Sequence, residues 1–229
     1  MNHSKFRSVN MHQQIKRFFF LFSLLVGISS FSYSATSEEN FENVSVGQLP
    51  QAWKRAETNA EHPAAVWEVT RSNDTSRGKH ILSLSSFEGG SFRYFNLCYT
   101  DAVSFRDGEI SVWFKANSGN IDQGGGIMWR VQDKDTYYVA RFNPLEDNFR
   151  FYSVINGDRK ELCSADVHLK KRWHLMKIVQ KGSHFEGFLD GKKLLNCDND
   201  IIKKSGGVGV WTKADAATSF DDFTVKDNN

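Results

Sequence analysis

The sequence predicts an all-β fold, and three observations carry that prediction. The 229 residues include 19 Phe, 6 Trp and 6 Tyr against only 3 Pro, and aromatic side chains favour pleated, half-buried strands. Short runs of alternating polar and apolar residues recur along the chain, separated by Gly, Asn and Asp. No stretch has the apolar spacing of a long amphipathic helix. We therefore expect a sandwich or a barrel of about a dozen strands.

The expected strands follow one another in chain order. They span 66–70, 80–85, 92–97, 109–116, 126–132, 137–143, 148–155, 174–181, 185–189, 192–196, 207–212 and 218–225. Asp190-Gly191 and Asn156-Gly157 are predicted tight turns, because both central positions of a type I′ turn need a positive φ. Four-residue connections at 133–136 and 144–147 make 126–154 a three-stranded meander.

Residues 1–34 have the three parts of a secretory signal peptide. Four basic residues and no acid precede an apolar stretch over 18–31, and the small residues Ser32 and Ser34 place cleavage after Ser34. The alternative, a single N-terminal anchor, needs a longer apolar run. We therefore expect an exported protein, periplasmic or extracellular, with one domain over 35–229 and no membrane contact after cleavage.

The charge of the exported chain disfavours nucleic acid as a partner. Without the four basic residues of the leader, 25 basic residues face 27 acidic ones, a formal net charge of −2. Binding to nucleic acid relies on a basic surface that neutralises phosphates.

The chain has three cysteines, Cys98, Cys163 and Cys197. Because this number is odd, at least one of them cannot form a disulfide within the chain. Cys163 and Cys197 both lie near predicted strand ends, so they are one candidate pair, but the sequence does not fix the connectivity. No C-x-x-C motif or Cys/His cluster supports a zinc site.

The meander over 126–154 has one apolar and one polar face. Pairing Gln132 with Tyr137 across the first turn, and Asn143 with Asn148 across the second, directs the apolar residues into the core. The opposite face then collects Met128, Arg130, Gln132, Tyr137, Val139, Arg141, Asn143, Arg150, Tyr152 and Val154. Trp113 of the strand over 109–116 lies near Arg130 if the two strands are adjacent.

Such a face suits a sugar, because rings pack on the C–H face of a pyranose while Arg and Asn bind its polar groups. An ordinary solvated sheet face is the alternative. The predicted ligand-binding residues are Trp113, Arg130, Tyr137, Arg141, Asn143, Glu146, Arg150 and Tyr152.

Two segments resemble a known family. The segment G-G-I-M-W-R-V-Q-D-K-D-T-Y-Y-V-A-R-F-N-P-L-E-D-N-F-R-F-Y over 125–152 and the segment G-G-V-G-V-W-T-K-A-D-A-A-T-S-F-D-D-F-T-V over 206–225 resemble a branch of the concanavalin A-like (laminin-G-like) jelly rolls. That branch is named the 3-keto-disaccharide hydrolase domain. The opening F-E-N-V-S-V-G-Q-L-P-Q-A-W over 41–53 is similar to its first strand and loop.

The resemblance implies a two-sheet antiparallel jelly-roll sandwich of the concanavalin A-like lectin/glucanase type, in secreted glycan-binding or glycan-processing proteins. Its concave face would include Arg130, Tyr138, Arg141, Asn143, Glu146 and Asn148, with Lys213 and Asp215 in a loop near one end. The register above sends Tyr138 inward instead.

The sequence therefore predicts a secreted carbohydrate-binding jelly roll that is a monomer. One alternative is a glycoside hydrolase or lyase acting on a keto-disaccharide, with Arg130 or Arg141 as the donor to an enolate. However, the acids Glu109, Glu146, Asp147 and Asp215 show no spacing typical of a glycosidase pair. A second alternative is an adhesion or interaction module that binds no glycan.

Calcium is the one cofactor that the resemblance suggests. In many jelly rolls of this superfamily a structural ion ties the first strand to the last. Asp221 and Asp222, with Glu42, would supply oxygen ligands of the hardness that calcium prefers.

Overall fold

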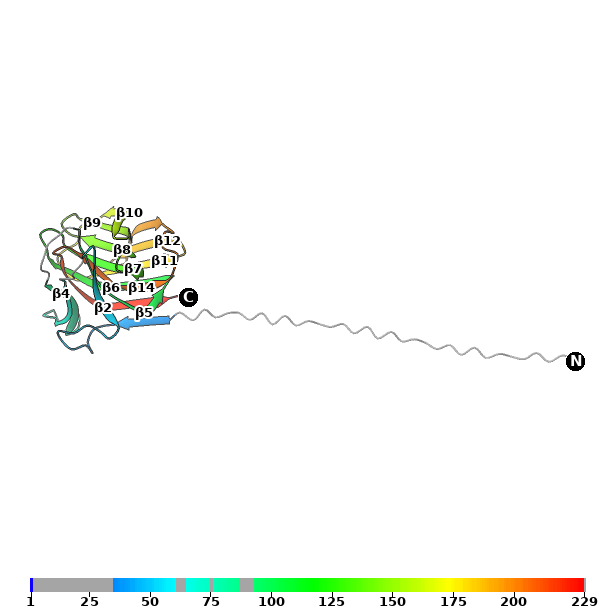
Figure 1. The fold of residues 1–229 in the computed structure, drawn as a ribbon, viewed down its shortest axis with the longest axis horizontal. Coiled ribbons are helices and arrows are strands. Elements are labelled where there is room, and N and C mark those ends of the chain that lie inside the picture. The colour runs from blue at the N-terminus through cyan, green and yellow to red at the C-terminus, as the bar shows by residue number, and fades with distance from the viewer. Residues whose placement is uncertain (2–34, 61–64, 75, 87–92, 229) are drawn as a thin grey trace. The chain divides into compact units, whose positions relative to one another are not determined.

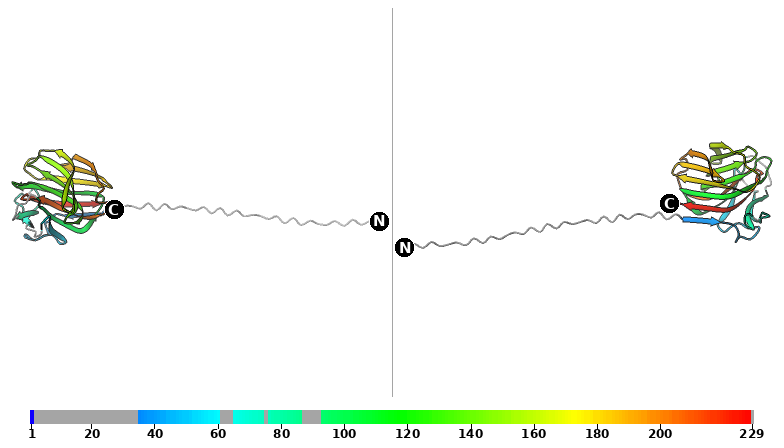
Figure 2. Two further views of the ribbon diagram at one scale, coloured as in Figure 1. Left: turned by 45° about the horizontal axis from the view of Figure 1, so that its top comes forward. Right: turned by 180° about the vertical axis from the view of Figure 1, so that it is seen from behind.

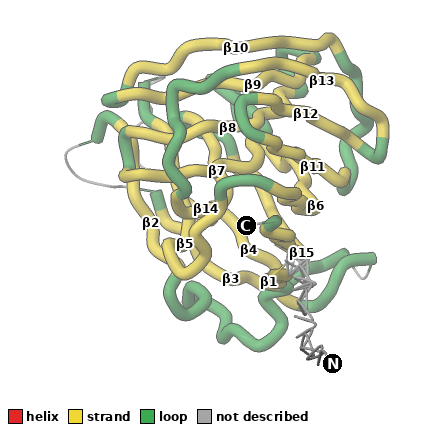
Figure 3. Tube along the Cα trace, turned by 90° about the vertical axis from the view of Figure 1, so that its right-hand side faces the viewer, coloured by secondary structure: helices red, strands yellow, loops and turns green. Residues whose placement is uncertain are grey.

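The computed structural model describes residues 1, 35–60, 65–74, 76–86 and 93–228 (Figure 1). Apart from Met1, the predicted signal peptide lies outside the described residues. All regular structure in the described part of the chain is β-strand (Figure 3), so the predicted all-β class is confirmed. Over these residues, no helix has the length and apolar character needed to cross a membrane.

The described strands form two antiparallel sheets, which Figure 2 shows from two further sides. Sheet A contains, in spatial order, β13 (Lys192–Asp198), β12 (His184–Leu189), β11 (His174–Lys181), β6 (Gly108–Ser118), β15 (Ala217–Asp227), β4 (His80–Ser86) and β3 (Val66–Arg71). The strand β1 (Ala35–Glu39) also pairs with β15. Sheet B contains β10 (Asp158–Asp166), β9 (Asn148–Ile155), β8 (Thr136–Asn143), β7 (Gly125–Asp133), β14 (Gly206–Lys213), β5 (Phe95–Phe105) and β2 (Trp53–Thr58).

Three strands of the structure were not predicted from the sequence: β1, β2 and β10. The strand β10 follows the Asn156-Gly157 turn, whose two residues have φ of 51° and 84°, as the predicted hairpin requires. The Asp190-Gly191 turn is also confirmed, with φ of 48° and 79°. Residue 92, where the expected strand 92–97 begins, lies outside the described residues.

The main hydrophobic core lies between the sheets. Alternate residues of β6, Ile110, Val112 and Phe114, are fully buried there, as their phase predicts. Trp129 of β7 is fully buried among aromatic rings, with the Phe151 ring centroid at 5.6 Å. Its indole N–H donates to Gln180 Oε1 at 2.7 Å, so its one polar atom is satisfied.

A disulfide between Cys163 and Cys197 joins β10, the edge strand of sheet B, to β13, the edge strand of sheet A. This settles the pairing that the sequence left open. Cys98 is free and buried, and burial raises the pKa of its thiol.

The register of the meander is confirmed in its second hairpin and wrong in its first. Asn143 pairs with Asn148, as predicted. In the first hairpin Trp129 pairs with Tyr138 and Asp133 with Thr136, so β7 has two more residues than β8 between these pairs. This β-bulge includes Arg130 at φ 48°, and it shifts the remainder of β7 relative to the predicted pairing.

Candidate functional site

Sheet B curls until strands from its two edges meet across its outer face. Asn59, which follows β2, donates its side-chain N–H to Gly157 O at 3.1 Å, in the turn before β10. The Arg159 guanidinium of β10 lies over the Phe95 ring of β5, 5.2 Å from its centroid. In the sheet order β10 and β2 are the two edge strands, so these contacts make the outer face of sheet B concave.

A second apolar cluster fills the base of this concave face. It lies on the opposite side of sheet B from the main core and comprises Phe95, Leu97, Tyr99, Met128, Val131, Tyr137, Val139, Tyr152, Val154 and Trp211. The Tyr137 hydroxyl receives a hydrogen bond from Trp211 Nε1 at 3.1 Å and lies 2.8 Å from Thr58 Oγ1. Because Tyr137, Trp211 and Thr58 belong to β8, β14 and β2, these hydrogen bonds link three strands at the base.

Most of the predicted binding residues on this face are buried. The exposed fraction is 0% for Tyr137, 1% for Arg141 and Asn143, and 3% for Tyr152. They do not form the open surface expected from the sequence, because Asp122 contacts Arg141 and Asn143, and Arg159 lies over the Tyr152 ring. They form the floor and the charged support of the site instead.

Arg130 does not lie on this face. Its side chain donates to Arg106 O at 3.0 Å, Ile202 O at 2.7 Å and Gly182 O at 3.0 Å, three carbonyls in turns and loops that connect other strands. The bulge at φ 48° changes the direction of this side chain, and the two-residue alternation used for the prediction fails there. Arg130 therefore holds loops together and is separated from Arg141.

Trp113 also lies elsewhere. It belongs to β6 of sheet A, where its neighbours Val112 and Phe114 face the main core. Trp113 therefore points to the outer side of sheet A, and the Arg77 guanidinium lies 4.0 Å from its ring centroid. The predicted proximity of Trp113 to Arg130 is wrong because β6 and β7 belong to different sheets.

Arg141 pairs with an acid that the sequence prediction missed. Asp122, in the loop before β7, accepts from Arg141 Nη2 at 2.6 Å and from Asn143 Nδ2 at 3.3 Å. Lys213 Nζ lies 3.1 Å from the other carboxylate oxygen of Asp122. Burial disfavours the charge of Arg141, but Asp122 outweighs it and raises the pKa of Arg141. This buried ion pair positions Lys213 at the edge of the face.

Glu146, in the turn before β9, and Arg150 of β9 continue the charged network. Glu146 Oε1 lies 3.5 Å from Arg141 Nη2, and Glu146 Oε2 lies 3.3 Å from Arg150 Nη1. Arg150 also pairs with Glu161 at 3.3 Å. The Glu146 side chain is 45% exposed and the Arg150 side chain is 30% exposed, so these two predicted residues do reach solvent. They form an ion pair with each other.

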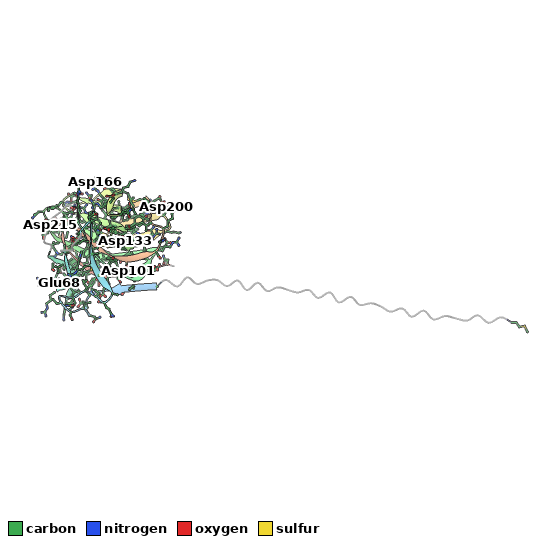
Figure 4. The ribbon with its side chains drawn as sticks, in the orientation of Figure 1. Glu68, Asp101, Asp133, Asp166, Asp200 and Asp215 are labelled. Atoms are coloured by element: carbon green, nitrogen blue, oxygen red, sulfur yellow. A yellow bond between two sulfur atoms is a disulfide. The ribbon has the colours of Figure 1, made fainter. Side chains whose placement is uncertain are left out.

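Asp215, which the resemblance placed in a loop near one end, organises the loop that carries Asp122. Its carboxylate accepts the backbone N–H groups of Asn120, Ile121 and Asp122 at 2.7 to 3.1 Å. Although burial opposes its ionisation, these donors hold the pKa of Asp215 below the usual value. In Figure 4 Asp215 lies apart from the other labelled acids, Asp133 and Asp166 among them. Asp215 thus acts as a positioning residue.

A cavity of about 740 Å³ opens where the two ends of the curled sheet meet. We call it the β5–β10 cavity, and its lining residues are Asn59, Arg93, Tyr94, Phe95, Gly157, Asp158, Arg159 and Lys213. Three of them are cationic and one is acidic. The sequence prediction missed the β10 side of this cavity because β10 was not recognised as a strand.

The three predicted calcium ligands do not gather into a metal-binding group. Among the described residues, no cluster of three or more His, Cys, Asp or Glu is arranged to hold a metal ion. Glu42 Oε1 accepts the backbone N–H of Lys79 at 2.6 Å, and Asp222 pairs with Arg77 at 3.2 Å. Asp221 is buried and accepts the backbone N–H of Asp222.

Comparison with known proteins relates the chain to others through its fold. No protein-family model matches the sequence, and no curated protein matches it. Solved structures do match. The carbohydrate binding module CBM66 from Bacillus subtilis aligns with a TM-score of 0.59 and 16% identity over 76% of this chain and 95% of that one.

Two further neighbours come from glycan-degrading enzymes. The Bacillus licheniformis beta-glucanase aligns with a TM-score of 0.56 and 14% identity over 85% of this chain and 98% of that one. Domain 4 of AbnA, a GH43 extracellular arabinanase from Geobacillus stearothermophilus, solved in complex with arabinotriose, aligns with a TM-score of 0.58 and 8% identity over 85% and 93%. The chain therefore has the jelly-roll sandwich fold of these carbohydrate-binding and glucanase domains.

Proposed function

We propose that this protein binds a carbohydrate in the β5–β10 cavity. The observation that carries the proposal is the curl of sheet B, which brings the aromatic residues Tyr94 and Phe95 and the polar side chains of Asn59 and Arg159 together around one cavity. Rings supply flat apolar area for a sugar, and planar amide and guanidinium groups supply hydrogen bonds to its hydroxyls. The volume of about 740 Å³ suits a ligand of a few sugar units.

The charges on this face favour binding over acid–base chemistry. Asp122 pairs with Arg141 and Lys213, and Glu146 pairs with Arg141 and Arg150. Although burial opposes the ionisation of Glu146, its hydrogen bond from Asn148 and the charges of Arg141 and Arg150 lower its pKa, so Glu146 is a weak base. We therefore prefer a binding module to a hydrolase.

The enzymatic alternative follows from the resemblance to the 3-keto-disaccharide hydrolase branch. Incubation of the domain with keto-disaccharides, with release of reducing sugar as the measurement, tests it directly. Turnover above that of a denatured control would replace the binding proposal by the enzymatic one.

Export and a monomeric state belong to the same proposal. We expect the chain recovered from the periplasm or medium to begin at Ala35, which intact-mass measurement checks. Light scattering on that chain should give the mass of one copy.

A glycan array on the mature domain tests the binding proposal, followed by calorimetry with the strongest hit. Tyr94→Ala should weaken that hit about tenfold, because a ring worth about 1 kcal/mol or more is lost from the cavity. Phe188→Ala is the matched control, since Phe188 is a half-buried ring on the outer side of sheet A beneath Lys177.

Equal losses in the two variants would contradict the assignment of the cavity. Absence of binding across the whole array would instead favour the interaction module that recognises no glycan.

A further inference from the structure

Arg159 is a cation of the β5–β10 cavity that forms no ion pair with any acid in the described part of the chain. Its guanidinium carbon lies 4.4 Å from the Tyr152 ring centroid, 5.2 Å from that of Phe95 and 5.8 Å from that of Trp211. Its Nη1 atom is buried and has no hydrogen-bond partner in the described part of the protein. A buried N–H group without an acceptor is costly, and because Arg159 lines the β5–β10 cavity, a ligand bound there is the candidate acceptor.

Arg159 takes part in none of the ion pairs that link the other named charges of the concave face. On the concave face, the cations Lys213, Arg141 and Arg150 are matched in number by the acids Asp122, Glu146 and Glu161, all of which form ion pairs with them. None of the described acids lies within ion-pair distance of Arg159. Burial also lowers the pKa of Arg159, since its charge is removed from water without a counterion.

The rings fix the orientation of this guanidinium. The contact with the Tyr152 ring holds the guanidinium beside the floor of the cavity, and its N–H groups are hydrogen-bond donors for a ligand. Lys213 and Arg93 line the same cavity, and Asp158 is its one acidic lining residue. The cavity therefore has a positive character, although the chain from residue 35 onward has a formal net charge of −2.

We propose that Arg159 receives an anionic group of the bound glycan, either the carboxylate of a uronic acid or a sulfate ester. This inference rests on the proposed carbohydrate binding and adds the class of sugar. Both groups offer the oxygen acceptors that a guanidinium binds through charge-assisted hydrogen bonds. Neutral sugars would leave the charge of Arg159 without an ion pair.

The test compares one glycan in two chemical forms. An array that holds oligogalacturonates, oligomannuronates, glucuronate-containing chains, sulfated galactans and neutral glucans, galactans and arabinans first gives the hit. For a uronate hit, calorimetry then uses the same oligosaccharide with its carboxylates reduced to primary alcohols. For a sulfated hit, it uses the desulfated chain. We expect the neutral form to bind at least about tenfold more weakly.

Protein variants identify the side chain that binds the anionic group of the glycan. Arg159→Gln should remove the preference, with about tenfold weaker binding of the anionic form and little change for the neutral form, whereas Arg159→Lys should retain part of it. Arg77→Gln is the matched control, because Arg77 also stacks on a ring, that of Trp113, but pairs with Asp222 on the other sheet. Thermal unfolding of each variant checks that the fold is intact.

Each outcome decides a different point. Equal affinity for the anionic and neutral forms, or equal losses for both forms in Arg159→Gln, would overturn this inference and leave the carbohydrate-binding proposal standing. Failure of every glycan on the array to bind would overturn both. The hit itself shows whether a carboxylate or a sulfate is the group recognised.

Discussion

At the residue scale, exposure separates the buried groups that support the concave face from the groups that we propose for ligand binding. Arg141, which the sequence singles out for binding, is buried and pairs with Asp122 at 2.6 Å. Removing one partner of such a pair leaves the other as an uncompensated buried charge. A loss of binding in a variant of Arg141 would therefore report damage to the floor of the cavity, so Tyr94 and Arg159 are the informative positions.

The raised pKa of Asp221 predicts that the stability of the fold depends on pH. It is 2% exposed, and burial together with the negative charge of Asp222 raises its pKa to about 7 from an ordinary 3.8. The folded protein then binds a proton that the unfolded chain has already released between about pH 4 and pH 7. Protonation of Asp221 therefore makes its full contribution to the free energy of unfolding below about pH 4, and this contribution is lost as the pH rises through about 7.

Asp221→Asn should remove this dependence, because the amide oxygen can still accept the Asp222 N–H and carries no charge. We expect similar stabilities at pH 4 and a variant more stable by roughly 2 to 4 kcal/mol at pH 8, measured by urea unfolding in the presence of a chelator. Parallel pH profiles for the two proteins would contradict the raised pKa. Addition of calcium ions tests the predicted calcium site, since an ion at Asp221 would stabilise the wild type alone.

At the scale of the elements, the sequence predicts whatever depends on neighbours along the chain. The two Asx-Gly turns, the phase of Ile110, Val112 and Phe114, and the second register of the meander follow from local rules, and the structure confirms them. The bulge at Arg130 breaks the two-residue alternation, and no Gly or Pro marks it. The start of β10 had a signal, because a hairpin turn at Asn156-Gly157 requires a strand after it.

The bulge gives Arg130 a structural role that can be measured. Arg130→Met removes the donor to the buried carbonyl of Ile202 and the donors to the carbonyls of Arg106 and Gly182, which lie in exposed residues. We expect the free energy of unfolding to fall by about 2 to 4 kcal/mol in urea titrations. Arg77→Met, which removes a more exposed guanidinium, should cost less than about 1 kcal/mol. A similar small cost for both variants would show that the loops do not depend on Arg130.

At the scale of the whole molecule, the concave face depends on contacts between distant parts of the chain. The contact between Asn59 and Gly157 joins residues 98 positions apart, and the contact of Asp122 with Lys213 joins the loop before β7 to the end of β14. Periodicity and turn chemistry carry no information about such pairs, so the two-sheet sandwich with a concave face was expected only from the family resemblance, and the contacts that curl sheet B could not be predicted. The cavity and Arg159 became visible only in the structure for this reason.

The disulfide between Cys163 and Cys197 links the two sheets at the edge that carries Arg159. It closes a loop between residues 34 positions apart. A cross-link of that length lowers the entropy of the unfolded chain and so raises the free energy of unfolding by about 3 to 4 kcal/mol. The double variant Cys163→Ser/Cys197→Ser should therefore unfold at lower urea concentration by a corresponding amount. It should also bind the glycan hit more weakly, because β10 loses its covalent attachment to β13.

A reductant provides the control for this prediction. Treatment should destabilise the wild type to the level of the double variant and leave the double variant unchanged, because the remaining thiol, Cys98, is buried and forms no disulfide. An unchanged urea midpoint in the double variant would show that packing alone holds the edges of the two sheets together. Lower stability with unchanged glycan affinity would show that the β9–β10 turn and the Asn59 contact suffice to position Arg159.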